Sequence, residues 1–159
     1  MTSALGPFFA WLQETTIATT IAQSTLLTGL LSGIHLLGLT LLVGGALVSG
    51  LRLLGVLLSE QPVTEVSGTA ARGMTVGLAI SVTTGLLLFA ARASTAAESG
   101  FFQLKMVVLL TAAVFHFAFY RSVARQGTAQ QHVLQFAGAL GLMLWFGVAV
   151  AGCAYILFE

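Results

Sequence analysis

The sequence contains no aspartate, and its five acidic residues are glutamates in predicted loops or near an end of the chain. Charged residues make up 7% of the chain, against about 25% in an ordinary soluble domain. The missing carboxylates exclude general acid–base chemistry by carboxylates inside apolar helices. They also disfavour proton pumps and cation transporters, which place Asp or Glu at depth. The six basic residues are scattered, so no partner of the nucleic-acid class is predicted.

Other signals are scarce as well. The single cysteine, Cys153, excludes an internal disulfide. No Lys or Arg precedes Arg52, so the N-terminus lacks the basic region of a signal peptide, and we expect Met1 to be retained. The chain has no nucleophile elbow, no phosphate-binding loop and no C-x-x-C pair. An electron-transfer or accessory subunit is therefore favoured over a stand-alone enzyme.

Hydrophobic residues are abundant, at 57% of the chain. They form blocks longer than about eighteen residues, as transmembrane helices do. The sequence predicts an all-α integral membrane four-helix bundle, a single transmembrane domain over residues 1–159 with spans of about 21–58, 74–91, 101–121 and 132–158. Ahead of the spans, PFFAWLQETT predicts a short interfacial segment, because Phe and Trp favour the membrane–water boundary.

The basic residues predict the orientation of the four spans. Four arginines fall on one side of the membrane, whereas Arg92 and Lys105 fall on the other. The side with more basic residues is expected to be cytoplasmic, which places both termini outside. The four arginines of the cytoplasmic side are Arg52, Arg72, Arg121 and Arg125.

Histidines are the polar residues that could carry chemistry within the spans: His35, His116 and, at the mouth of the fourth span, His132. An ionisable group in a span indicates a functional site, although an imidazole can also hydrogen-bond across helices. Two histidines on different spans favour haem b, held by one imidazole from each helix. Copper is the competing metal, because imidazole suits it too. The thioether and thiol groups that favour Cu(I) show no spacing that groups them with a histidine: Met74, Met106, Met143 and Cys153.

Other residues could complete a haem site. On the His35 face of the first span, Ser32 could accept the second imidazole N–H, and Gly38 would leave room for a planar macrocycle. Arg52 and Lys105 could meet the anionic propionates at an interface. A lysine that opens a span also reaches the headgroups by snorkelling, so Lys105 has two interpretations.

The depth of the histidines leaves two ligand pairs open. His35 lies 17 residues before Arg52, whereas His116 lies 5 residues before Arg121 on a span of the same direction. At ~1.5 Å per residue the two differ by roughly 18 Å along the axis. His116 and His132, on antiparallel neighbours joined by a short loop, are the alternative metal pair.

The chain resembles an uncharacterised bacterial family of four-span membrane proteins over nearly its whole length. The resemblance is carried by HLLGLTLLVGGALVSGLRLLG, TTGLLLFA, FFQLKMVVLL with FHFAFYRSVAR, and LMLWFGVAVAGCAYI. It implies the bacterial inner membrane, and it favours His35 with His116 as the pair. This chain has Gly50 where the family usually has Asp, and Cys153 where it usually has Arg.

More distantly, the chain is similar to the copper-resistance D-type proteins and to small transmembrane b-type cytochromes. Residues and resemblance together predict a haem b-binding protein. It would be an electron-transfer cytochrome between quinone and a periplasmic redox partner, or a membrane anchor. The alternatives are a non-redox subunit of a larger membrane complex or homo-oligomer, without a cofactor, and a copper or small-solute permease.

Overall fold

The computed structural model describes residues 5–120 and 130–158, and every regular element within them is helical. Four of the described helices are long and apolar enough to cross a membrane. A π-helical turn, η1 (His116–Tyr120), continues the third of them. The predicted all-α, four-span membrane bundle is confirmed, and the chain is a multi-pass membrane protein. The four helices are α3 (Thr25–Leu53), α4 (Val63–Ala91), α6 (Gly100–Phe115) and α8 (Gln131–Phe158).

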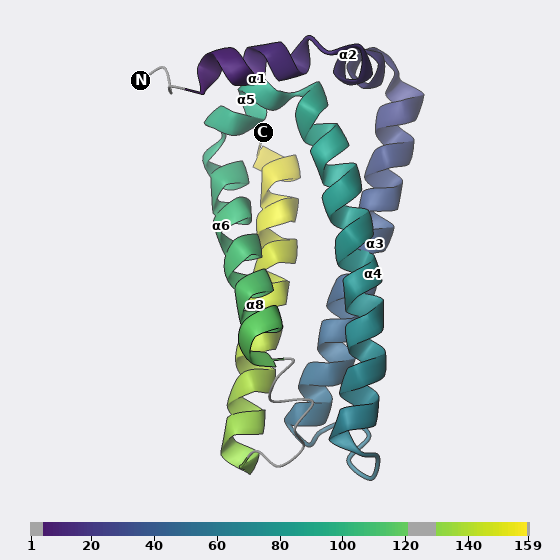
Figure 1. The fold of residues 1–159 in the computed structure, drawn as a ribbon, viewed down its shortest axis with the longest axis vertical. Helices are drawn as coiled ribbons and strands as arrows, with labels where there is room; N and C mark the ends of the chain where they lie inside the picture. The colour runs from purple at the N-terminus through teal and green to yellow at the C-terminus, as the bar shows by residue number, and fades with distance from the viewer. Residues whose placement is uncertain (1–4, 121–129, 159) are drawn as a thin grey trace.

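Three short helices lie at one end of the bundle: α1 (Gly6–Gln13), α2 (Thr16–Gln23) and α5 (Ala93–Glu98). Figure 1 shows α1 and α2 lying across this end, beside which the C-terminus also lies. Helix α1 packs on α5, and α2 packs on α4. Phe8 and Trp11 of α1 remain exposed, as expected for an interfacial segment.

The helix boundaries differ from the predicted spans at both ends of the α3–α4 hairpin. The predicted first span runs from 21, but Ser24 breaks the chain into α2 and α3, and its hydroxyl accepts a backbone N–H of the first turn of α3 at 3.3 Å. The predicted second span starts at 74, but α4 begins at Val63, directly after Pro62. Hydropathy marks the apolar part of a helix, whereas helix formers of low hydropathy extend α4 beyond it.

The apolar stretch after Leu53 forms a loop instead of more helix. The Arg52 guanidinium donates to the carbonyl of Ser59 at 3.2 Å and to that of Gln61 at 3.0 Å. Gly55 has a φ of 78°, a left-handed conformation that glycine adopts without strain. This loop accounts for the difference between the predicted end at 58 and the observed end of α3.

Glycines set the packing of the bundle. Helices α3 and α4 form the largest interface, and a Cβ on Gly77 would lie 2.6 Å from the carbonyl oxygen of Gly38. Helix α8 packs along α6 and also crosses α3, where a Cβ on Gly138 would lie 2.8 Å from the carbonyl oxygen of Gly50. Such close backbone approach is how helices pack in lipid, where burying Leu against Leu gains nothing. The central core is formed by Leu42, Ala46, Met74, Ala112, Trp145 and Val148.

Candidate functional site

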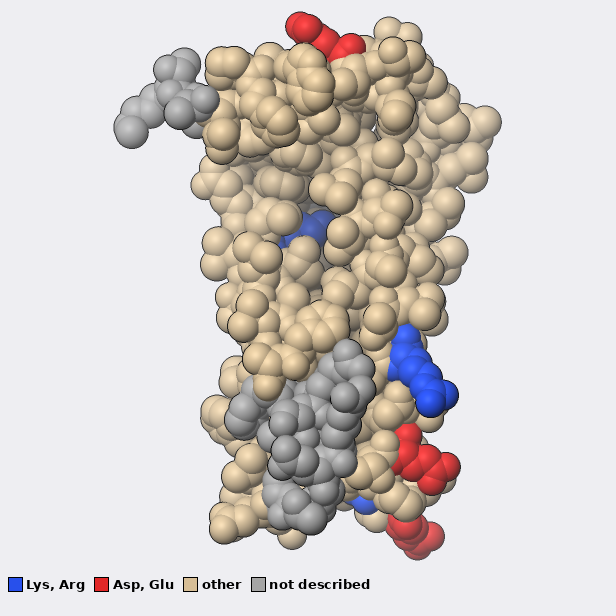
Figure 2. Space-filling model, viewed as in Figure 1, with Lys and Arg blue, Asp and Glu red and all other residues tan. Residues whose placement is uncertain are grey.

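A hollow separates the α3–α4 pair from the α6–α8 pair in the half of the bundle nearest α1 and α5. Figure 2 shows it on one face of the molecule, with a basic side chain at its floor. Among the described helices, α4 forms no extensive interface with α6 or α8, and the central core closes the space below. The side chains at this level therefore come from both helix pairs.

His35 of α3 is held by a hydrogen-bond chain that continues into α4. Its Nδ1 lies 3.1 Å from the Thr84 hydroxyl of α4. That hydroxyl has one proton, which it donates to the carbonyl of Ile80 at 2.7 Å, so it accepts from the imidazole. With that acceptor, we infer that Nδ1 carries the proton and Nε2 the lone pair. Metal-ligating histidines are oriented in this way.

Lys105 of α6 faces His35 from the other helix pair. Its Nζ lies beside Gly152 of α8, 3.5 Å from where a Cβ would stand. Its ammonium lies within electrostatic range of the His35 imidazole, and no carboxylate among the described residues pairs with it. An ionisable group in a span without a counter-charge indicates a binding site for a ligand that supplies one.

Two glycines lie directly against these groups. Gly152 adjoins Lys105, and a Cβ on Gly85 would lie 3.1 Å from Cε1 of His35. A Cβ on Gly85 would press on the imidazole, whereas a Cβ on Gly152 would make ordinary contact with the lysine. Each wall of the hollow therefore has one polar side chain next to one position without a side chain.

Aromatic rings close the hollow toward α1 and α5. Phe89 of α4 stacks on Phe102 of α6, with ring centroids 5.1 Å apart and planes 12° apart. Phe102 in turn meets Tyr155 of α8 edge to face at 5.8 Å. Each ring lies about one helical turn from a residue of the hollow, on the side nearest α1 and α5. Phe89 is one turn from Gly85, Phe102 from Lys105 and Tyr155 from Gly152. They separate the polar groups from the membrane surface.

The first-span residues predicted to surround a cofactor have other roles. A Cβ on Gly38 would lie 2.7 Å from the Ser81 Oγ, so α4 fills the space expected for a macrocycle. Ser32 is half-buried, but the partner of His35 is Thr84. Arg52 lies 17 residues from His35, roughly 26 Å along α3, and binds the loop after its helix.

The structure brings neither predicted histidine pair to one metal ion. His116 lines a pocket with Met74, which precedes Thr84 by ten residues on α4, so roughly 15 Å of helix separates its level from that of His35. His132 is exposed and precedes Gly141, which lines the same pocket, by nine residues or roughly 13 Å. The described residues contain no group of three His, Cys, Asp or Glu side chains that could hold a metal.

Comparison with protein-family models matches residues 8–159 to a family of unknown function, DUF6644. The chain belongs to this family. The match covers all four spans of the DUF6644 protein, and with them both walls of the hollow. Comparisons with curated proteins and with solved structures found no match. The function of this DUF6644 member therefore has to be argued from its own residues.

Proposed function

We propose that this DUF6644 protein binds haem b in the hollow between its helix pairs, with His35 as an iron ligand, and transfers electrons in the bacterial inner membrane. The observation that carries the proposal is the hydrogen bond between Nδ1 of His35 and the hydroxyl of Thr84. Its Nδ1–H is held by Thr84, so the Nε2 lone pair is available on the side away from that hydroxyl.

The side chains at the hollow fit an iron ligated by one histidine. They do not fit the predicted pair of His35 with His116, because these two residues lie at different levels along the bundle axis. The imidazole and the lysine side chain lie directly against Gly85 and Gly152, so neither glycine adds a side chain to the walls of the hollow. Lys105 supplies the positive charge that an anionic propionate needs. A bound haem supplies reversible one-electron chemistry at its iron.

The surroundings support transfer between a lipid-soluble donor and an external partner. The hollow opens on the outer face of the bundle, where a quinone can approach from the bilayer (Figure 2). The short helices and the C-terminal end of α8 lie at the end nearest the hollow (Figure 1). The basic residues favour this end as periplasmic, so a periplasmic redox protein is the proposed second partner.

The test is an absorption spectrum of the detergent-purified protein, recorded oxidised and then dithionite-reduced, with iron and haem quantified in the same sample. We expect a sharp reduced α-band and about one haem per chain. A protein that stays colourless after expression with added haem precursor would contradict the proposal.

The Thr84→Val variant tests the hydrogen bond that orients His35. Valine keeps the shape of threonine and removes the acceptor of the Nδ1–H. We expect haem affinity to fall by roughly 10–100-fold, as for other outer-shell partners of metal ligands. Haem titration of the apoprotein measures the change, and Thr83→Val, at an exposed neighbouring position, is the matched control.

A second candidate function, a non-redox subunit of a larger membrane complex, is favoured by one observation. Gly29 and Gly33 form a G-x-x-x-G pair on α3 that is exposed, and a Cβ on either residue would contact nothing within 4 Å. Such a pair allows close packing of a helix from another chain. A stable complex with further membrane subunits and no haem in the purified assembly would favour this function over the first.

A further inference from the structure

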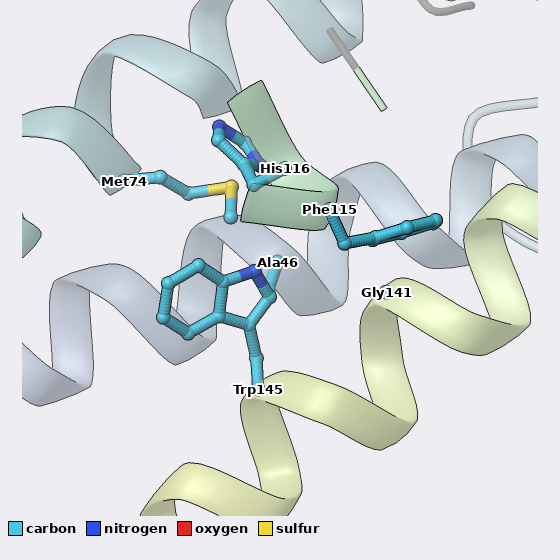
Figure 3. A pocket seen from close by; sticks show the side chains of 6 residues that line it. All are labelled: Ala46, Met74, Phe115, His116, Gly141 and Trp145. Carbon is cyan, nitrogen blue, oxygen red and sulfur yellow. The ribbon is translucent and has the colours of Figure 1, made fainter. Parts of the chain in front are cut away.

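A second polar site lies in the core, apart from the hollow. His116 is 3% exposed and begins η1, and π-helical turns occur often at functional sites. Its imidazole borders a narrow gap between core side chains. The pocket is lined by Ala46, Met74, Phe115, His116, Gly141 and Trp145, drawn in Figure 3.

The thioether of Met74 reaches this pocket because α3 has a glycine opposite its stem. A Cβ on Gly45 would lie 2.6 Å from Cγ of Met74, so a side chain there would displace the methionine. Met74 is 2% exposed. In Figure 3 its sulfur points into the space between the His116 imidazole and the Trp145 indole. The two rings are 6.1 Å apart between centroids, at 74°.

The chemistry of these three groups selects a class of metal ion. Thioether and imidazole are soft or borderline ligands, and thioether favours Cu(I) over Mg²⁺, Ca²⁺ or Mn²⁺. No carboxylate lines the pocket, so a hard divalent cation would find no neutralising oxygen ligands. The indole ring is the aromatic group that best attracts a cation placed over its face. The space is too narrow for a water molecule, which suits an ion of low coordination number that keeps no water.

We propose that Met74 and His116 form a binding site for Cu(I), with the Trp145 indole beside the ion. The site is independent of haem binding, since its ligands lie roughly 15 Å along α4 from the level of His35. The spacing of residues in the sequence grouped no methionine with a histidine, whereas the folded bundle places Met74 and His116 in the lining of one pocket.

The test is an anaerobic titration of the detergent-purified protein with Cu(I), in ascorbate, against the chromogenic chelator bicinchoninate. We expect one strongly bound Cu(I) per chain, and at least a tenfold lower affinity for Met74→Leu, which conserves volume and removes the sulfur. Met143→Leu is the matched control, because Met143 is 71% exposed on the outside of α8. Its affinity should equal that of the unchanged protein.

Fluorescence locates the ion independently of the chelator. The chain has two tryptophans, so a Trp11→Phe background leaves Trp145 as the reporter. Cu(I) should quench this fluorescence in step with binding, and Met74→Leu should require at least tenfold more Cu(I). Three results would overturn the proposal: no bound Cu(I) in the folded protein, an unchanged affinity in Met74→Leu, or loss of binding in Cys153→Ser, which would assign the ion to the exposed thiol.

Discussion

We expect the His35→Ala variant to purify without haem, whereas His116→Gln and His132→Ala retain it. Among the three histidines, His35 has an imidazole that faces the hollow with Nδ1–H already held by Thr84. Removing an iron ligand should cost more affinity than the roughly 10–100-fold typical of outer-shell changes, so haem should fall to background. Haem per chain, from the pyridine haemochrome spectrum, is the measurement.

The other two variants separate this assignment from the histidine pair favoured by the sequence. His116 is buried in the core, so glutamine replaces it with a polar side chain of similar length. As a folding control, each variant must have the same helical circular dichroism signal as the unchanged protein. It must also have the same elution volume in size-exclusion chromatography in detergent. Loss of haem in His116→Gln with normal folding would restore a role for both histidines. Loss only in His132→Ala would move the site to α8.

The fold was largely predictable from composition and hydrophobic block length. Four apolar blocks and an aromatic leading segment follow directly from the requirements of a bilayer. The boundaries were less predictable, because they depend on local hydrogen bonds. The cap at Ser24 and the Arg52 bonds to the loop carbonyls end or begin helices where hydropathy continues.

The site could be predicted only in part, because its partners come from the register between helices. In an antiparallel pair, the contact of Gly38 with Gly77 places His35 near residues 80–84. The sequence shows hydroxyls in that stretch and Gly85 directly after it, but it does not show which glycines of the two helices meet. The sequence identified Lys105 as a candidate to meet a haem propionate. Its position near His35 depends on how the helices pack together, which the sequence does not show.

The same register predicts that Gly77→Ala destabilises the bundle strongly. The added Cβ would lie 2.6 Å from the carbonyl oxygen of Gly38 and 2.7 Å from the backbone nitrogen of Leu42. Backbone atoms cannot move away as a side chain would, so α3 and α4 must separate. Overpacking of this kind costs about 1–3 kcal/mol in the free energy of unfolding. Unfolding in mixed detergent and SDS micelles, followed by circular dichroism, measures the loss.

Gly73→Ala is the control for this substitution, since it makes the same change one turn away on α4. A Cβ at Gly73 would contact nothing within 4 Å. Alanine is favoured over glycine in a helix by about 1 kcal/mol, so this variant should be as stable as the unchanged protein or more so. Equal destabilisation by both substitutions would mean that glycine matters to α4 for another reason than close contact with α3. A selective loss at Gly77 would establish the register that places Thr84 beside His35 and Met74 opposite Gly45.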